Sequence, residues 1–180
     1  PFIAPHSELN SDFGCLSRSS AVNVAGALIW VDNNCSVRLF EGGDARVISD
    51  NGLAEQIRGT PAAEIRASWF TKDQHTFYVL TLGSLATWAY DLSTGFWMKF
   101  SSLGYDYCRA HLLATVDGVT YAADAITSQV YRLDPDLRTD AGGVFTLLFR
   151  AFDAPAGPST PVANLQLQCD VGAGPRSGQG

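Results

Sequence analysis

The stretch of residues 74–102 constrains the fold of this chain most, because it is apolar, aromatic and interrupted mainly by turn residues. Residues 76–82 (T-F-Y-V-L-T-L) are rich in aromatic and β-branched side chains, a composition typical of a strand. Gly83-Ser84 follows, and a glycine at the first central position suits a two-residue type II′ hairpin turn. Residues 85–91 are therefore predicted to form the return strand.

A second turn is predicted at residues 91–95 (D-L-S-T-G). The Asp91 carboxylate can accept hydrogen bonds from backbone amides, and Gly95 can adopt a positive φ angle. Residues 96–101 then form a third strand. The stretch as a whole predicts a three-stranded antiparallel meander.

The first strand of this meander carries apolar side chains on both sides. Phe77 and Val79 point to one face of the sheet, whereas Tyr78 and Leu80 point to the other. Both faces must therefore be covered. The layered sheets of a β-propeller or a β-sandwich satisfy this requirement, and an isolated meander does not.

The rest of the chain predicts an all-β protein built of antiparallel meander sheets. Its 17 glycines and 8 prolines against a single methionine favour short strands and turns over long helices. Asp117-Gly118 is the strongest hairpin signal in the sequence. Further strands are predicted at residues 21–31 (split near Gly26), 36–40, 45–48, 111–116, 119–123, 129–133, 144–152 and 162–171.

One short helix is predicted at residues 53–58, after several possible capping residues at 49–52 and before Gly59. Thr60-Pro61 is able to cap a second helical turn, since proline is tolerated at the first helical position. Residues 65–70 are also compatible with a strand. The sequence leaves that choice open.

Aromatic residues suggest a repeat among the predicted sheets. Trp30, Tyr78 and Tyr121 each lie in a strand before a turn, 48 and 43 residues apart, which matches the length of a propeller blade. We therefore expect an extended connection at 1–20, blade-like meanders at 21–150, and a linker (154–161) and strand within 151–180. Since residue 1 is proline and residues 172–180 are rich in glycine, we expect an internal piece of a longer protein.

The charge of the chain argues against a general nucleic-acid surface. Its formal net charge is -6 and its isoelectric point is about 4.8, whereas phosphate binding depends on clustered lysine and arginine. No run of 18 apolar residues is present, so the sequence predicts no membrane-spanning helix.

The sequence predicts no catalytic, cofactor-binding or metal-binding residue. A nucleophile and a base could be sought among His75, Asp91, Ser93, Cys108 and His111, but no Gly-x-Ser-x-Gly elbow supports a hydrolase. His75 is instead interpreted as a hydrogen-bonded structural residue. Cys108-x-x-His111 is only half of a zinc pattern.

Other polar patterns are interpreted as ordinary structure. Asp32-Asn33-Asn34 and Asp134-Pro135-Asp136 lack the glycine and distal glutamate of a calcium loop and are predicted to be turns. Residues 172–178 lack the lysine of a phosphate loop.

The cysteines and tryptophans are also assigned to ordinary structure. The four cysteines have no Cys-x-x-Cys spacing and are predicted to be buried thiols, although oxidised pairing stays open. Trp30, Trp88 and Trp97 are assigned to the core, and Trp69 with Trp88 could line a carbohydrate groove if exposed. The cysteines lie at positions 15, 35, 108 and 169.

Six runs of the sequence share a pattern with one protein family: W-V-D-N-N-C-S-V-R-L-F-E-G-G (30–43), R-V-I-S-D-N-G-L-A-E-Q-I (46–57), H-T-F-Y-V-L-T (75–81), T-W-A-Y-D-L-S-T-G-F-W (87–97), Q-V-Y-R-L-D (129–134) and L-Q-L-Q-C-D-V-G-A-G (165–174). Together these runs resemble the packaged-DNA stabilisation proteins of short-tailed bacteriophages. The resemblance covers nearly the full length. Two positions depart from the family pattern: Gln74 stands where a glycine is expected before His75, and Ala122-Ala123-Asp124 replaces a Gly-Asp turn.

The resemblance implies a structural virion protein of the phage tail and not an enzyme. Such a head-to-tail connector forms a homo-oligomeric ring of six copies below the portal and adaptor, where it extends the DNA channel and helps to retain packaged DNA. It is assembled in the cytoplasm of the host bacterium, and DNA passes it without sequence-specific binding. An acidic channel wall suits this role, because a basic wall would hold the genome through counterion release.

A binding module is the alternative function. A β-propeller or lectin-like domain would recognise a glycan or a protein partner through its loop tips. A connector must close a ring through repeated heterologous contacts, whereas a glycan-binding module need not.

Overall fold

The computed structural model describes residues 13–133, 139–140 and 143–144. All of them belong to the first of the two units into which the chain divides, Pro1–Thr146. Several sequence predictions lie outside the described residues: the Asp134-Pro135-Asp136 turn, the strands at 144–152 (beyond Val144) and 162–171, the linker at 154–161, the loop at 172–178 and Cys169.

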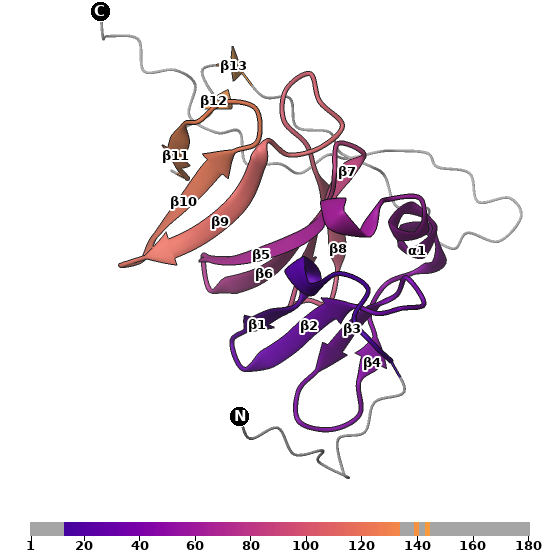
Figure 1. The fold of residues 1–180 in the computed structure, drawn as a ribbon. Helices are drawn as coiled ribbons and strands as arrows, with labels where there is room; N and C mark the ends of the chain where they lie inside the picture. The colour runs from indigo at the N-terminus through magenta and orange to yellow at the C-terminus, as the bar shows by residue number, and fades with distance from the viewer. Residues whose placement is uncertain (1–12, 134–138, 141–142, 145–180) are drawn as a thin grey trace, which may run out of the picture. The chain divides into compact units, whose positions relative to one another are not determined.

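The described residues form antiparallel sheets with little helix, which confirms the all-β prediction (Figure 1). We call β1–β4 the first sheet, β5–β8 the middle sheet and β9–β11 the third sheet. Each is a meander in which successive strands pair, as in a propeller blade. The strands are β1 (Val22–Val24), β2 (Ala27–Val31), β3 (Val37–Phe40), β4 (Arg46–Val47), β5 (Ile65–Lys72), β6 (His75–Leu82), β7 (Ala86–Asp91), β8 (Trp97–Phe100), β9 (Ala110–Val116), β10 (Val119–Asp124), β11 (Val130–Arg132), and a separate pair, β12 (Thr139–Asp140) and β13 (Gly143–Val144).

The middle sheet has four strands, one more than the sequence predicted. Strand β5 pairs with β6 along its whole length, from Ile65 opposite Leu82 to Lys72 opposite His75. Its side chains alternate between the two faces of the sheet, with Ile65 and Phe70 buried on opposite sides. This alternation settles the open choice at residues 65–70 in favour of a strand.

The connection between β6 and β7 is longer than the predicted two-residue turn. Leu82 pairs with Ala86, so residues 83–85 form the connection. The backbone N–H of Leu85 donates to the carbonyl of Leu82 at 2.9 Å and closes a tight turn. The exposed Leu85 therefore lies at the hairpin tip, and the return strand begins one residue later than predicted.

Three other hairpins have two-residue connections in which both central residues take positive φ angles. The central pairs are Ala25-Gly26, Asp73-Gln74 and Asp117-Gly118, and the last confirms the predicted hairpin. A glycine occupies the second position in two of them, but Gln74 occupies it between β5 and β6. A left-handed conformation costs a residue with a Cβ atom roughly 1 kcal/mol. The departure noted at Gln74 therefore leaves the turn formed but strained.

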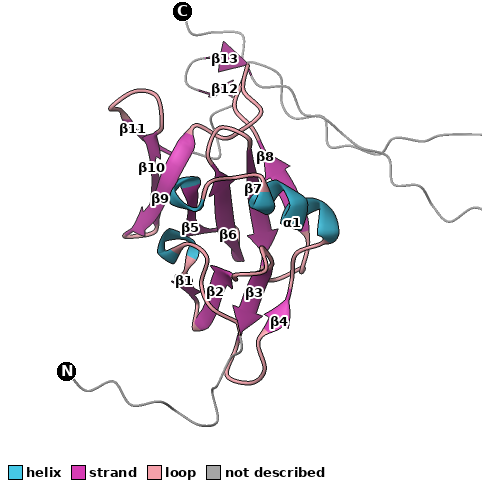
Figure 2. Cartoon of the chain, turned by 45° about the vertical axis from the view of Figure 1, so that its right-hand side comes forward, coloured by secondary structure: helices cyan, strands magenta, loops and turns pink. Residues whose placement is uncertain are grey.

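Both faces of the middle sheet are covered, as the sequence predicted (Figure 2). One face packs against the first sheet and a helix, and the other face packs against the third sheet. Fully buried residues at the first contact include Ile29, Leu39, Ile57, Tyr78 and Leu80. The second contact is formed by Phe70, Val79, Ala89, Leu113 and Ala122.

The predicted helix is present as α1 (Asn51–Arg58) and begins two residues earlier than expected. Asp50 caps it, because its carboxylate accepts a hydrogen bond from the backbone N–H of Leu53 at 2.7 Å. Leu53 and Ile57 lie four residues apart on one face of α1 and are buried in the core.

Two short 3-10 helices flank the first sheet and its helix, η2 (Arg18–Ser20) and η3 (Ala62–Glu64). Thr60 does not cap the second of them. Its hydroxyl instead donates to the carbonyl of Gln56 at the end of α1. Within the described residues, no helix is long and apolar enough to cross a membrane.

The turn between β7 and β8 yields a stability prediction. Gly95 has φ +74, so a valine there would be forced into the left-handed region. We expect Gly95→Val to lower the free energy of unfolding by about 1 kcal/mol or more, measured by urea denaturation. Gly43→Val is the control, because Gly43 lacks a positive φ and an added Cβ would meet no atom within 4 Å. Equal unfolding midpoints for the two variants would contradict the turn assignment.

Candidate functional site

Each of the three sheets has an aspartate at or just after the end of one strand, before the turn to the next strand. Asp32 follows β2, Asp91 ends β7 and Asp124 ends β10, and a turn follows each of them. In each case the carboxylate accepts a hydrogen bond from the backbone N–H two residues further on, at 2.8 to 2.9 Å. This arrangement is an Asx turn, which fixes the chain reversal before the next strand.

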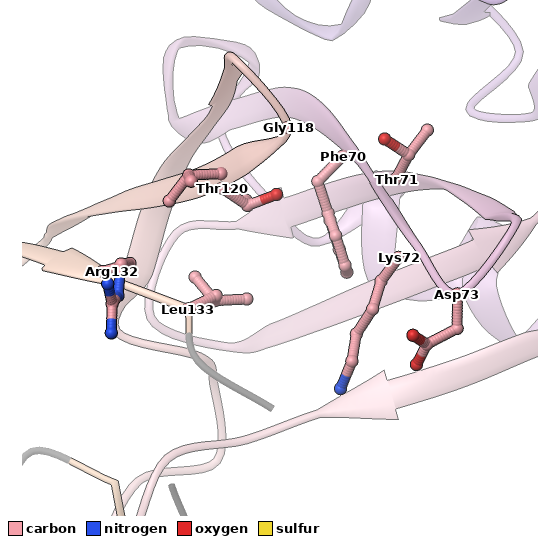
Figure 3. Close-up of a pocket in the computed structure, with 9 residues that line it drawn as sticks. Phe70, Thr71, Lys72, Asp73, Gly118, Thr120, Arg132 and Leu133 are labelled. Carbon is pink, nitrogen blue, oxygen red and sulfur yellow. The ribbon is translucent and has the colours of Figure 1, made fainter. Parts of the chain in front are cut away.

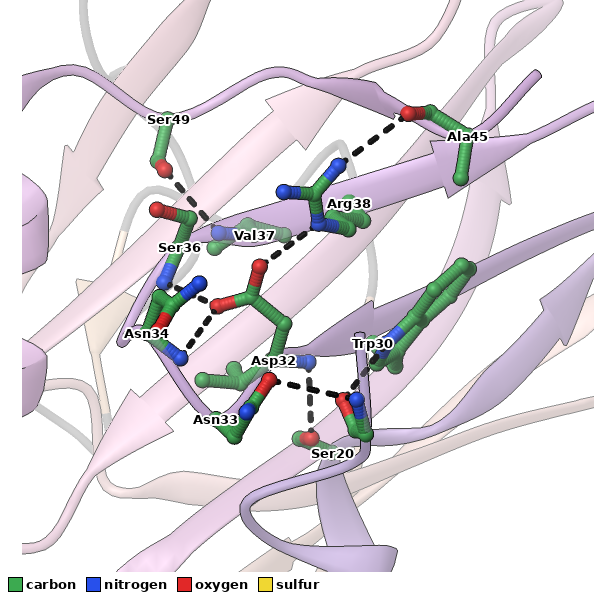
Figure 4. Close-up of polar contacts among 12 residues, drawn as sticks. Ser20, Trp30, Asp32, Asn33, Asn34, Ser36, Val37, Arg38, Ala45 and Ser49 are labelled. Carbon is green, nitrogen blue, oxygen red and sulfur yellow. Dashed lines mark hydrogen bonds and ion pairs between the residues drawn. The ribbon is translucent and has the colours of Figure 1, made fainter. Parts of the chain in front are cut away.

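The carboxylate of Asp32 is fully enclosed (Figure 4). It accepts hydrogen bonds from the backbone N–H groups of Asn34 and Ser36, and Arg38 Nε lies 2.6 Å from its Oδ2. The Arg38 guanidinium also donates to the carbonyl of Ala45. These contacts occupy both carboxylate oxygens. They confirm that Asp32-Asn33-Asn34 is a turn.

Asp91 pairs with His75, whose Nδ1 lies 2.8 Å from Asp91 Oδ2. This confirms that His75 is hydrogen-bonded. Burial alone would raise the pKa of Asp91, but hydrogen bonds from Thr94, Ser93 and His75 outweigh it and lower the pKa below its ordinary value. The carboxylate is therefore charged at neutral pH.

Asp124 is held in the same way by Arg109, whose guanidinium contacts both carboxylate oxygens. Burial favours the neutral acid, yet the N–H of Ile126, the Arg109 guanidinium and the Thr127 hydroxyl together hold the pKa of Asp124 well below its usual range. The three aspartates thus have a cationic or ionisable partner each: Arg38, His75 and Arg109.

The residues considered for catalysis lie in different surroundings. Ser93 reaches Asp91 through its backbone N–H, and Cys108 N–H donates to the Thr87 hydroxyl. Burial lowers the pKa of His111, and its Nε2 is buried without a hydrogen-bond partner. Over the described part of the chain, no three His, Cys, Asp or Glu side chains are grouped so that they could hold a metal ion.

Of the tryptophans predicted to be core residues, Trp30 is buried, whereas Trp88 and Trp97 are partly buried and pack against the core; each indole N–H has a partner. Trp88 donates to the Gln56 side chain at 2.9 Å and Trp97 to the carbonyl of Ile48 at 2.7 Å. Trp30 is 8% exposed. Trp69, which could line a carbohydrate groove with Trp88 if exposed, is 36% exposed, whereas Trp88 packs against the core.

The three described cysteines are thiols, as predicted, but the prediction that they are buried is wrong. Cys15 is exposed, and Cys35 and Cys108 are half-buried thiols. Cys15 and Cys35 lie in the irregular segments beside β2 and β3, where the backbone is near the surface. Cysteine is a residue type that is usually buried, so burial was expected. These two cysteines lie outside the strands, and their side chains remain partly or fully accessible to solvent.

One cavity lies between the tip of the β5–β6 hairpin and the inner face of the third sheet (Figure 3). Its volume is about 460 Å³. Phe70 and Leu133 supply apolar walls, and Thr120 supplies a hydroxyl that lies 3.0 Å from the Thr115 hydroxyl. Lys72 and Asp73 stand at the hairpin end of the cavity (Figure 3).

Sequence reasoning did not find this cavity, because its walls come from sheets about 50 residues apart in the chain. The one local signal was Gln74, which stands at a hairpin position where a glycine is expected, next to the cavity residues Lys72 and Asp73. In comparisons with known proteins, no family model and no curated protein matches this chain.

The Asp91 turn yields a prediction of pH dependence. Because its pKa is lowered on folding, the charged carboxylate stabilises the fold above its ordinary pKa near 3.9, and this is lost as the pH falls through the folded pKa. We expect Asp91→Asn to unfold at lower urea concentration than the parent at pH 7. The difference should shrink as the pH falls below about 4.

The control for this experiment is Asp44→Asn, which changes an exposed aspartate in the β3–β4 connection. It should unfold like the parent at every pH. A difference between Asp91→Asn and the parent that stays constant down to about pH 2 would show that the carboxylate charge does not stabilise the turn.

Proposed function

We propose that this protein is a structural component of the connector of a short-tailed bacteriophage. Its copies would form a ring below the portal and adaptor, extend the DNA channel and help to retain the packaged genome. The sequence runs in all three sheets support this proposal by their resemblance to the packaged-DNA stabilisation family. One structural observation carries it further, namely an exposed apolar face on the third sheet.

This face is the outer side of β9–β11, opposite the side that packs on the middle sheet. Leu112 and Val116 lie four residues apart on the outer face of β9, and the strand register places Tyr121 and Val130 on the same face. These four side chains are 61%, 56%, 40% and 68% exposed. A contiguous apolar face of this kind marks an interaction surface.

A neighbouring copy is the partner that we propose for this face. Within the chain, the first and third sheets each cover a face of the middle sheet with apolar side chains, so face-to-face stacking is the packing that these sheets use. A contact between the third sheet of one copy and a different surface of the next is heterologous, and a ring results if the rotation closes. The charge of -6 fits a channel wall that does not hold DNA.

The alternative, a glycan- or protein-binding module, is favoured by the cavity beside the β5–β6 hairpin. Such a module has no need to assemble. The state of assembly therefore separates the two functions.

The test is imaging of the protein by negative-stain electron microscopy, alone and mixed with portal and adaptor rings of a short-tailed phage. We expect rings with a central hole, and symmetry classification would give the copy number. Persistent monomers under both conditions would contradict the connector role.

A pair of variants tests the proposed contact. Val130→Lys places a charge within the proposed apolar contact, and we expect it to leave monomers at concentrations where the parent forms rings. Phe96→Lys is the matched control, because Phe96 is 70% exposed in the β7–β8 turn. Loss of rings in both variants, or in neither, would show that the outer face of the third sheet does not form the contact between copies.

A further inference from the structure

The cavity of about 460 Å³ between the β5–β6 hairpin and the third sheet has the size of a small-molecule site. Such sites in proteins span roughly 300–1,000 Å³ and combine apolar walls with a few polar groups. Here the apolar wall at the base is Phe70, which is only 4% exposed and is held by ring stacking on Phe77 at 5.0 Å. The base of the cavity is therefore rigid.

The polar groups at the mouth of the cavity are not used by the fold. Lys72 and Asp73 are exposed, and neither makes an ion pair or a side-chain hydrogen bond in the described part of the chain. By contrast, Asp32, Asp91 and Asp124 are all bonded to the turns that follow them. Figure 3 shows the Lys72 and Asp73 side chains at the hairpin end of the cavity.

Both central residues of the β5–β6 hairpin are non-glycine residues with positive φ angles, whereas the β1–β2 and β9–β10 hairpins each have only one, Ala25 and Asp117. Gln74 has φ +67 at the position that Gly26 and Gly118 occupy in the β1–β2 and β9–β10 hairpins. A glycine would relieve the strain without changing the turn. Strained residues that are not replaced by glycine are concentrated at ligand contacts. Two independent features, unused polar groups and a strained turn, thus meet beside one cavity.

We propose that the cavity and the β5–β6 turn bind a carboxylate-bearing sugar residue, such as a uronic acid unit. The Lys72 ammonium would contact the sugar carboxylate, and the Asp73 carboxylate would accept hydrogen bonds from sugar hydroxyls. The hydroxyl of Thr120 and the apolar walls formed by Phe70 and Leu133 would face the remainder of the ring. This inference does not rest on the connector role, since a ring component and a free module can each carry a sugar site.

The ligand is assigned by the combination of groups. A neutral sugar would leave the Lys72 ammonium unpaired, and a small anion such as acetate would leave the apolar walls and Asp73 without contacts. Arg132 also lines the cavity, from the third sheet, whereas Lys72 lies at the hairpin end beside Asp73, so we assign the contact with the sugar carboxylate to Lys72.

Titration calorimetry of the whole chain with glucuronate, glucose and acetate tests the proposal. We expect saturable binding of glucuronate, and binding of glucose and acetate that is at least about tenfold weaker, since a charge-assisted hydrogen bond and the ring contacts are then lost. Equal binding of acetate would show an anion site only. Equal binding of glucose, or no saturable heat with glucuronate at about 10 mM, would overturn the proposal.

Two lysine variants locate the site. Lys72→Met should weaken glucuronate binding about tenfold and leave the thermal unfolding midpoint unchanged. Lys99→Met is the matched control, because Lys99 is exposed on β8 and does not line the cavity. Equal affinity in the Lys72 variant and the parent would place the sugar elsewhere and overturn the proposal.

Gln74→Gly tests the role of the strained turn. It removes the left-handed strain and the side chain together, so we expect a higher unfolding midpoint and weaker glucuronate binding. A higher midpoint with unchanged affinity would overturn the assignment of the turn to the site, whatever the result of the assembly experiment.

Discussion

The structure depends on one constraint: the middle sheet is apolar on both faces and therefore needs cover on both sides. Successive residues of β6, such as Tyr78 and Val79, are both buried because they enter different cores. The first sheet and α1 supply one cover, and the third sheet supplies the other. The chain order follows from this need, since the segments before and after the middle sheet each fold back onto it.

The three aspartate turns share one hydrogen-bonding pattern, but the basic residue that contacts the carboxylate differs between the sheets. Each carboxylate fixes a chain reversal by accepting backbone N–H groups, and this requires that it stay charged while enclosed. Arg38 comes from the strand after its turn, whereas His75 and Arg109 come from segments before theirs. The turn geometry is thus the same in the three sheets, but the basic residue that contacts the aspartate comes from a different place in the chain.

The sequence was informative where a local rule decides the structure. The Asp117-Gly118 hairpin, a short helix ending at residue 58 and the two-sided burial of β6 follow from turn chemistry, capping and side-chain alternation, and these predictions are confirmed, although the helix begins at Asn51 and not at residue 53. It was less informative where distant segments meet. The pairing of β5 with β6 determines that residues 65–70 form a strand, and the walls of the cavity come from two different sheets. No local sequence pattern predicts that these two sheets lie beside each other, so the candidate site could not be predicted.

The stacking of the sheets also means that stability is distributed unevenly. The middle sheet is protected on two sides, but the third sheet contributes only Leu113 and Ala122 as buried core residues and has an uncovered outer face. Opening it exposes one contact, whereas opening the middle sheet exposes both. Amide hydrogens of β9–β11 should therefore exchange with solvent through local opening, while those of β6 exchange only when the whole stack unfolds.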